Sequence, residues 1–446
     1  FWPVKQGTDL THPCKAGPGI SAPRHLGEDP TWTFQFTSPA TARFYKREKM
    51  DFTHKTPVID SQGNIYIETH MGPIWIVRPD GELRGFLRLG HAIANPALHG
   101  RYLYAAEGAG WAHCVDIETL KIKWSTKYAG NGTPDSWNVT VADPPGVVLV
   151  MGDGDPPRKM TALRMDNGEK VWTYSVQGNV YNFLPSVWLD RGIFIFCDSG
   201  GGMYCLRLKD GAEVWTDKQE ENKESFSTGF CVGAPNGLVY HTYNKGPISV
   251  YPRAVGQLMG GVGVVKAWDR DTGEVRWTVE YDGLEGNNAP MMVEKPDGSG
   301  SIVVVPLGSN ADCGEDQEPY EWVGRIVGLD GDTGKELWAW DPPMWKWPGA
   351  KGPHFHDSGE MYNPDSWSNP PVLGADGTMY CQWHDGTIYA FSPYTGEVYS
   401  QWTLPDCGES GIPAIGPGLL ACPGGFGLKV FRDLDLERAW REAAAA

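Results

Sequence analysis

Residues 267–277 read AWDRDTGEVRW, and residues 328–338 read GLDGDTGKELW. Both stretches begin with small or apolar residues, pass through Asp-Thr-Gly, and end in a β-rich segment that carries Trp. Glycine supplies the positive φ that a tight hairpin requires, and the polar residue before it hydrogen-bonds the backbone of the turn. Each stretch therefore predicts a strand, a turn and a second strand.

The same eleven-residue pattern recurs along most of the chain. Clear copies occupy residues 162–172 and 205–215, and weaker copies occupy residues 76–86, 114–124 and 390–402. Another hairpin precedes each copy, and a short segment with Pro and small or branched residues, such as Pro290-Met291-Met292, precedes that hairpin. A unit of four short strands is typical of one β-propeller blade, with small residues on the crowded inner strand and Trp on the outer strand.

Seven complete units fit between about Pro57 and Leu404, and the eighth is split between the chain ends. Residues 411–433 supply three strands, whereas residues 30–36 (PTWTFQF) have the pattern of an outer strand without a blade. Joining them closes the ring and removes two sheet edges that invite aggregation. We therefore predict an all-β, eight-bladed β-propeller of four-stranded antiparallel blades, with seven blades as the alternative. The expected organisation is an N-terminal arm (1–29), one propeller domain (30–433) and a C-terminal tail (434–446).

These copies resemble the pyrroloquinoline-quinone (PQQ) repeat, Ala-x-Asp-x-x-Thr-Gly-x-x-x-Trp, of the quinoprotein alcohol dehydrogenase-like propeller family. The resemblance covers nearly the whole chain apart from the predicted arm and tail. It implies that Trp residues of the outer strands dock between neighbouring blades, namely Trp124, Trp172, Trp215, Trp277 and Trp338. Because propellers host enzymes, scaffolds and receptors alike, the resemblance implies the fold rather than the function.

Charge and composition exclude several kinds of partner. The net charge of -17 opposes a general phosphate-binding surface, so nucleic acid is not an expected partner. No apolar run approaches the roughly 18 to 20 residues that cross a bilayer, so direct membrane insertion is not expected. Because the chain begins at Phe1 rather than Met, we expect that an upstream segment such as a secretion signal has been removed or omitted. Asn131 and Asn138 each begin an N-glycosylation tripeptide. We expect a secreted or extracellular glycoprotein, or a periplasmic protein in a bacterium.

Nine cysteines contain no CxxC pair, which disfavours structural zinc and thioredoxin-like chemistry. Cys197 and Cys205 flank the Gly200-Gly201-Gly202 turn almost symmetrically, so one interpretation is a disulfide across a hairpin. The other interpretation is two small, buried apolar side chains.

A cofactor site on the propeller axis is implied by the resemblance, because quinoprotein dehydrogenases hold PQQ there between a Trp and a disulfide of adjacent cysteines, beside Ca²⁺. This chain has no adjacent Cys pair and no CxxCH haem motif. Polar residues nevertheless enter several inner strands and form candidate ligands for Ca²⁺ and a polar cofactor: Asp135, Asn138, Asn287, Asp365, Asn369 and Glu409. The alternative is that these groups cap strand ends at a wet channel mouth.

A long insertion, residues 341–369, interrupts the repeat and is a second candidate site. His354, His356 and Glu360 have the ligand types of a Zn or Mn site. Three Trp residues of the insertion are candidates for contacting a partner protein or a glycan, namely Trp345, Trp347 and Trp367. By contrast, we assign Asp269-Arg270-Asp271, which resembles part of a Ca²⁺ loop, to the repeat's hairpin turn.

Nearly every strong signal in the sequence builds blades, and no nucleophile-base pair or cofactor fingerprint is evident. We therefore predict a noncatalytic scaffold that binds other proteins or assembles with itself, and no cofactor. Two alternatives stay open: a PQQ- and Ca²⁺-dependent dehydrogenase acting on alcohols or sugars, and a glycan-binding propeller.

Overall fold

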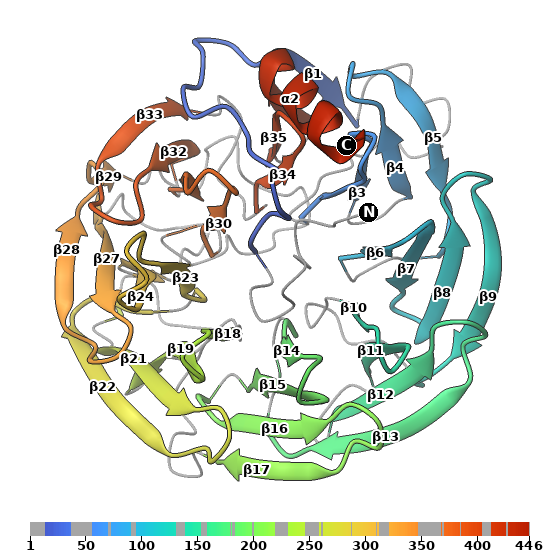
Figure 1. Cartoon of the computed structure of the whole chain (residues 1–446), viewed down its shortest axis with the longest axis horizontal. Helices are drawn as coiled ribbons and strands as arrows, with labels where there is room; N and C mark the ends of the chain where they lie inside the picture. The colour runs from blue at the N-terminus through green and yellow to red at the C-terminus, as the bar shows by residue number, and fades with distance from the viewer. Residues whose placement is uncertain are drawn as a thin grey trace.

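A computed structural model shows the fold of the chain. It describes residues 14–36, 56–69, 73–90, 95–130, 139–152, 158–178, 180, 183–198, 200–218, 231–245, 258–259, 262–286, 288–308, 310–311, 321–346, 367, 370–383, 385–403, 412–424 and 427–445. Eight four-stranded sheets are arranged around a central axis (Figure 1), as the repeat predicted.

Blades 1 to 4 each take four consecutive antiparallel strands, ordered from the axis to the rim. Blade 1 contains β2 (Val58–Ile59), β3 (Ile65–Glu68), β4 (Ile74–Val77) and β5 (Leu83–Leu87). Blade 2 contains β6 (Ala97–His99), β7 (Tyr102–Ala106), β8 (Trp111–Asp116) and β9 (Lys121–Lys127). Blade 3 contains β10 (Thr140–Ala142), β11 (Val147–Gly152), β12 (Arg158–Arg164) and β13 (Lys170–Val176). Blade 4 contains β14 (Ser186–Trp188), β15 (Ile193–Cys197), β16 (Met203–Arg207) and β17 (Glu213–Asp217).

Blades 5 to 8 repeat this order, and blades 5 and 6 carry additional short strands that are described below. Blade 5 contains β18 (Cys231–Gly233), β19 (Leu238–Lys245), β21 (Val262–Asp269) and β22 (Val275–Asp282). Blade 6 contains β23 (Met291–Glu294), β24 (Ser301–Gly308), β27 (Gly324–Asp330) and β28 (Glu336–Trp340). Blade 7 contains β30 (Val372–Leu373), β31 (Met379–Gln382), β32 (Thr387–Phe391) and β33 (Val398–Thr403). Blade 8 contains β34 (Ala414–Gly416), β35 (Leu419–Gly424), β36 (Gly427–Arg432) and β1 (Trp32–Gln35).

Blade 8 joins the two ends of the chain. Strand β1 pairs with β36 in antiparallel register, from Trp32 opposite Val430 to Gln35 opposite Gly427. Phe34 and Phe36 are buried beside Trp75 of blade 1. The predicted closure and the blade count of eight are therefore confirmed, and the seven-bladed alternative is wrong.

Six of the eight seams, meaning the contacts between neighbouring blades, share one docking arrangement. A Trp of the outer strand donates its indole N–H to a carbonyl in the next blade's outer turn, at 2.8–3.1 Å. The pairs are Trp32 with Pro79, Trp124 with Met165, Trp172 with Leu208, Trp215 with Arg270, Trp277 with Gly331, and Trp338 with Pro393. Each ring also covers the turn glycine, where an added Cβ would lie 2.6–2.9 Å from a ring atom: Gly81, Gly168, Gly211, Gly273, Gly334 and Gly396. These glycines have positive φ, so both the backbone and the ring require glycine.

In the seam between blades 1 and 2, other residues take the places of the docking Trp and the turn glycine. Gly85, not Phe86, pairs with Ile76 at the register position that holds Trp elsewhere. Leu120 replaces the turn glycine with a φ of 54°, and its Cδ1 lies 3.1 Å from a Cβ built on Gly85. Arg84 donates to the carbonyl of Ile117 at 2.8 Å, the position that accepts the indole N–H in other seams. In this seam blade 1 supplies the glycine, Gly85, and blade 2 supplies the large side chain, Leu120, which is the reverse of the other seams.

The N-terminal arm fills the seam between blades 7 and 8, where blade 8 has no outer hairpin. The Trp402 indole donates to the carbonyl of Glu28 at 2.8 Å, so the arm supplies the missing turn carbonyl. Ser400, opposite Ala390 at the docking position, donates to the Arg24 carbonyl and accepts from the Leu26 N–H.

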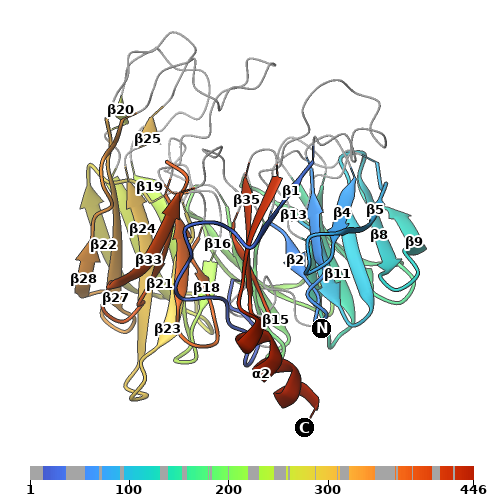
Figure 2. The same cartoon turned by 90° about the horizontal axis from the view of Figure 1, so that it is seen from above.

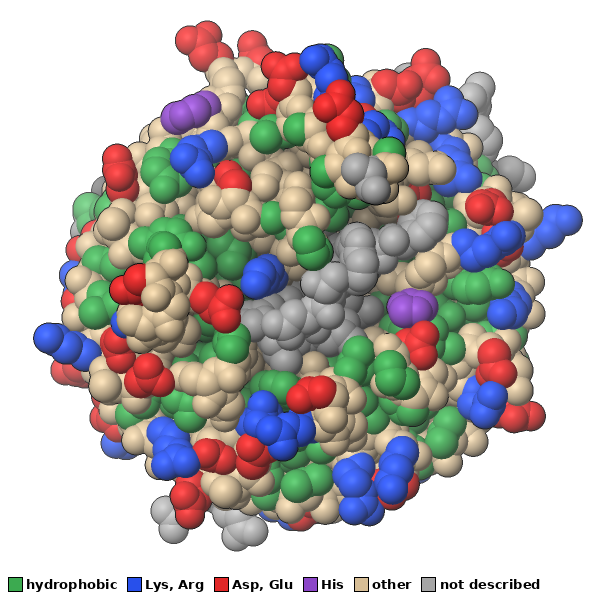
Figure 3. Space-filling view, in the orientation of Figure 1, with side chains coloured by type: hydrophobic (Ala, Val, Ile, Leu, Met, Phe, Trp, Pro, Cys, Tyr) green, Lys and Arg blue, Asp and Glu red, His purple; other side chains and the backbone are tan. Residues whose placement is uncertain are grey.

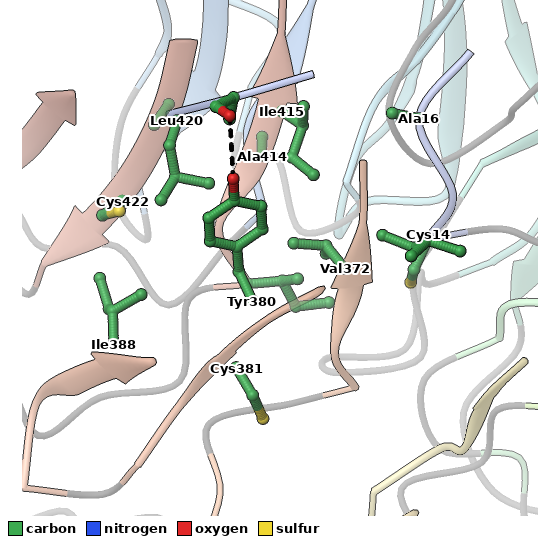
Figure 4. Close-up of a cluster of buried hydrophobic side chains, with 14 of the residues drawn as sticks. Cys14, Ala16, Val372, Tyr380, Cys381, Ile388, Ala414, Ile415, Leu420 and Cys422 are labelled. Atoms are coloured by element: carbon green, nitrogen blue, oxygen red, sulfur yellow. Dashed lines mark hydrogen bonds between the residues drawn. The ribbon is translucent and has the colours of Figure 1, made fainter. Parts of the chain in front are cut away.

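Further along the arm, residues reach the inner strands of blade 7. The arm pairs with β30 through a parallel bridge at Lys15, and the Tyr380 hydroxyl contacts the carbonyls of Ala22 and Pro23, each at 3.0 Å. Figure 4 shows Cys14 and Ala16 of the arm beside Val372, and Tyr380 reaching a carbonyl oxygen.

A C-terminal helix, α2 (Leu434–Ala445), projects from one face of the disc beside blade 8, as Figures 1 and 2 show. Asp433 caps it by accepting from the N–H groups of Asp435 and Leu436. Glu437 binds Arg432 at 2.6 Å and Arg441 at 2.9 Å, and Arg441 reaches the Gln62 carbonyl in blade 1. The sequence analysis expected only a tail here. Among the residues that the structure describes, no helix has the length and apolar character needed to cross a membrane.

Candidate functional site

The face opposite α2 carries additional structure on blades 5 and 6. Strand β20 (Leu258–Met259), between β19 and β21, pairs with β25 (Asn310–Ala311), between β24 and β27. Strand β26 (Glu321–Trp322) pairs with β29 (Trp345–Lys346), which extends the β27–β28 hairpin. Figure 2 shows β20 and β25 rising above the blades on the side away from α2. We call these four strands the crown.

Main-chain hydrogen bonding in the crown joins insertions from two different blades. Leu258 is opposite Ala311 and Met259 is opposite Asn310, so a segment of blade 5 and a segment of blade 6 form one small sheet. At the foot of the crown, Val323 and Met344 flank the Trp322–Trp345 pair and are 42% and 55% exposed. The propeller therefore presents a raised structure on one side of this face, with exposed apolar side chains at its foot.

A polar cluster below the crown connects blades 5 and 6 with the segment that enters blade 7. Asn288, which precedes β23, donates its side-chain amide to the Trp367 carbonyl at 2.6 Å, and Thr242 of β19 donates to the Asn288 carbonyl. Asn244 accepts from the Gly286 N–H at 2.8 Å. Asn288 is 3% exposed, and no described residue forms a hydrogen bond with its Oδ1. Asn288 therefore offers a buried acceptor beside the inner strands.

Trp367 is buried rather than displayed. It is 1% exposed, donates its indole N–H to the Leu307 carbonyl at 2.8 Å, and packs 4.8 Å from Trp383. The expectation that Trp367 contacts a partner or glycan on the surface is therefore corrected, because its ring fills the interior between blades 6 and 7. The Trp345 backbone belongs to β29 of the crown.

A buried carboxyl group, Asp198, and a partly buried one, Asp385, lie in turns at strand ends on this face and have raised pKa values. Burial raises the pKa of Asp198, although the Tyr204 hydroxyl and the N–H groups of Gly200 and Gly202 donate to it. Burial likewise raises the pKa of Asp385, which accepts from the Thr387 N–H at 2.7 Å. Because their own turns donate to them, these carboxylates have the contacts expected of turn caps.

A carboxylate, an imidazole and a hydroxyl meet in the seam between blades 1 and 2. His113 Nδ1 is 2.8 Å from the Ser125 hydroxyl, and His113 Nε2 is 3.8 Å from Glu107 Oε1. Burial lowers the pKa of His113 and raises the pKa of Glu107. The equivalent position in blade 3 pairs Thr161 with Thr173. The sequence analysis missed this group, and only the twelve-residue spacing across the hairpin could have indicated it.

Most of the predicted site residues lie outside the described residues. This applies to the axial candidates Asp135, Asn138, Asn287, Asp365, Asn369 and Glu409, to the metal candidates His354, His356 and Glu360, and to Trp347 and Asn131. Within the described part of the chain, no group of three or more His, Cys, Asp or Glu side chains is arranged to hold a metal ion.

The predicted Cys197–Cys205 hairpin disulfide is wrong. Cys197 is opposite Met203, and Cys205 is opposite Ile195, so the two thiols do not face each other. Both are buried free thiols. The second interpretation, small buried apolar side chains, is confirmed for this pair.

The α2 face carries interspersed charges. Figure 3 shows acidic and basic side chains alternating around this face, with no broad patch of one sign. A mixed surface of this kind is typical of a solvated face rather than of a phosphate-binding one.

Comparisons with known proteins agree with the architecture. A family model described as outer membrane protein assembly factor BamB matches residues 61–235. No curated protein matches the sequence. The solved structure of BamB from Moraxella catarrhalis is similar, with 13% identity, a TM-score of 0.56, and coverage of 85% of this chain and 96% of that one.

Two enzymes share the fold to a similar degree. The quinohemoprotein alcohol dehydrogenase from Pseudomonas putida is 11% identical with a TM-score of 0.59, covering 92% of this chain and 77% of that one. The enzyme from Comamonas testosteroni is 11% identical with a TM-score of 0.57, covering 93% and 78%. At these identities the similarity extends to the fold alone. The repeat, the eight closed blades and these matches together show that the chain has the fold of a PQQ-like β-propeller.

Proposed function

We propose that this propeller is a noncatalytic scaffold that binds other proteins through the crown and the segments around it. The observation that carries the proposal is the β20–β25 pairing, which joins insertions of two neighbouring blades into one structure above the disc. A docked tryptophan supports the next blade's turn in most seams, so the blades provide a rigid base. Loops held on a rigid scaffold are where propellers and other folds carry binding function.

The chemistry at the foot of the crown supports a protein partner. Val323 and Met344 expose apolar surface there, beside the Arg325–Asp341 ion pair of 2.7 Å. An apolar centre with charged groups at its rim is the usual composition of a protein-protein interface. The similar structure of BamB, named as an assembly factor, is consistent with a scaffold.

We further propose that the protein acts outside the cytoplasm, either secreted or in a periplasm. The support is the pair of N-glycosylation tripeptides at Asn131 and Asn138, together with the similarity to an outer membrane assembly factor. Mass spectrometry of protein isolated from its source would locate glycans at these residues or exclude them.

Site-specific photocrosslinking in the native cells tests the scaffold function. A photoreactive amino acid at Val323 or Met344 should give discrete adducts of higher mass. The matched controls are Ile122 and Val214, which are 50% and 45% exposed on the outer strands of blades 2 and 4. Equal adducts at the control positions, or none at the foot of the crown, would contradict the proposal.

An activity assay tests the noncatalytic part separately. Purified protein is mixed with PQQ and Ca²⁺, and dye-linked oxidation of alcohols and sugars is recorded. We expect no turnover. Uptake of the quinone with turnover would replace the scaffold by the dehydrogenase alternative.

A further inference from the structure

Two cysteines from different blades meet in the seam between blades 4 and 5. Cys197 ends β15 of blade 4, and Cys231 begins β18, the innermost strand of blade 5. Each is 1% exposed, and both belong to one buried cluster with Ile195, Met203 and Val239. They are 34 positions apart in the sequence, so no hairpin spacing indicates that they meet.

Hydrogen bonds fix the Cys231 thiol against blade 4. Its Sγ lies 3.2 Å from the Ile195 carbonyl and 3.9 Å from the Ser186 hydroxyl, and that hydroxyl donates to the Cys231 carbonyl at 3.0 Å. Ile195 and Cys197 are two residues apart on one strand, so their side chains lie on the same face of β15. The Cys231 thiol therefore contacts β15 at Ile195, two residues before Cys197.

The two thiols also contact each other. Burial raises the pKa of Cys197, and the hydrogen bond with Cys231 raises it further. Burial alone would raise the pKa of Cys231, but its hydrogen bonds with Cys197 and Ser186 lower it.

We propose that Cys197 and Cys231 form a disulfide that joins blades 4 and 5 when the chain folds in an oxidising compartment. The two S–H bonds are lost and one S–S bond forms. The two protons and two electrons pass to a disulfide oxidant, such as glutathione disulfide or a protein oxidoreductase, which is reduced to two thiols. Because both thiols are buried in the finished seam, the bond forms while the two blades dock.

The bond would fasten the blade that carries the crown to its neighbour. It closes a loop over residues 198–230 and restricts the unfolded chain, which is the usual origin of disulfide stabilisation. Blade 5 contributes β20 to the crown, so the disulfide would hold one side of the crown's base. This inference does not depend on the scaffold function.

Peptide mapping of the refolded chain tests the proposal. Reduced full-length protein is refolded in a glutathione redox buffer, its remaining thiols are alkylated in denaturant, and it is digested without reductant. We expect one peptide pair linked through Cys197 and Cys231, and an apparent Tm that falls by several degrees on reduction. Cys231→Ser should abolish both results, whereas Cys114→Ser should change neither, because Cys114 is buried in the seam between blades 2 and 3.

Two results would overturn the inference. One is a folded chain, judged by its circular dichroism, in which Cys197 and Cys231 are both alkylated as thiols. The other is Cys197 linked to a different cysteine. If the chain does not refold, the same mapping on protein exported to a bacterial periplasm gives the same choice of outcomes.

Discussion

Each docking tryptophan stabilises its seam in two ways, through the packing of its ring and through the hydrogen bond of its indole N–H group. In the seam between blades 5 and 6, the Trp277 ring covers Gly334 while its indole N–H donates to the Gly331 carbonyl at 2.8 Å. The ring excludes water from the turn, and the N–H donates to a carbonyl that also accepts from the Tyr240 hydroxyl at 3.1 Å. Both parts are needed to fill the seam.

Substitution of Trp277 separates these two contributions. Trp277→Phe keeps a ring and removes the donor, so we expect a loss of about 1 kcal/mol of unfolding free energy. Trp277→Ala removes both and should cost about 3 kcal/mol. Urea denaturation gives the values, with Val275→Ala as the control because Val275 is 46% exposed. Equal costs for Phe and Ala would contradict this division.

Leu120 and Gly85 form a reciprocal pair at the residue scale. Leu120→Gly relieves the left-handed backbone, worth about 1 kcal/mol, but leaves the seam without a large side chain. Because the second effect is larger for a packed leucine, we expect net destabilisation. The double variant Gly85→Trp/Leu120→Gly recreates the docking arrangement of the other seams and should recover stability. A double-mutant cycle by urea denaturation would show an interaction energy, and simple additivity would contradict the exchange.

The carboxylate of Asp269, in a hairpin turn of the repeat, makes the stability of the protein depend on pH. Its side chain accepts from Arg276, and this hydrogen bond holds the pKa of Asp269 at about 2. Because the folded pKa lies below the unfolded value of about 3.9, the stabilisation is present above pH 4 and is lost as pH falls through 2. In Asp269→Asn, urea denaturation should show lower stability at pH 6 and a smaller deficit at pH 2. An unchanged deficit across that range would exclude the ionised pair as its origin.

At the element scale, the repeated hairpins could be predicted from the sequence, whereas the elements that occur only once could not. In most hairpins the turn glycine and the following Trp recur at fixed spacing, so the blades and the split eighth blade follow from the sequence. Helix α2 occurs once, after the last repeat, and its Asp433 cap carries no periodic signal. The crown was missed for the same reason, since two-residue strands such as β20 leave no pattern.

Contacts between blades are the other limit of sequence reasoning. Cys197 was paired with Cys205 because hairpin spacing is local, whereas its neighbour in space, Cys231, comes from the next blade. Phe86 was aligned with Trp because the turn of blade 1 is one residue shorter than the others: Gly81 lies five residues after Ile76, whereas Gly168 lies six residues after Ala162. The axial and metal candidates lie outside the described residues and remain predictions.

The N-terminal arm behaves as one element in the seam between blades 7 and 8. Tyr380→Phe should cost about 1 kcal/mol, because the carbonyls of Ala22 and Pro23 lose a buried hydroxyl donor. Arg24→Ala should change stability by less than about 1 kcal/mol, since its ion pair with Asp376 is exposed. Urea denaturation compares them, and a larger effect at Arg24 would mean that the surface of the arm carries its docking.

At the scale of the whole molecule, ring closure depends on four residue pairs between β1 and β36. Phe34→Asp places a charge at a side chain that is 9% exposed and packs against Trp75, so we expect the closure to fail. The measurable results are faster cleavage after the N-terminal arm in limited proteolysis and a larger hydrodynamic radius. Gln35→Asp, on the exposed side of the same strand, is the control. Unchanged cleavage in Phe34→Asp would show that β36 does not need β1.

The pairing of β1 with β36 also orders events on the ribosome. At typical synthesis rates of roughly 5 to 20 residues per second, β1 is made some 20 to 80 seconds before its partner emerges. During that interval an apolar strand with Phe34 and Phe36 has no native neighbour, and blade 1 lacks the cover that they provide. The last blade to be translated is therefore the one that allows the first segment to fold, and a nascent chain of this protein needs protection at its leading end until then.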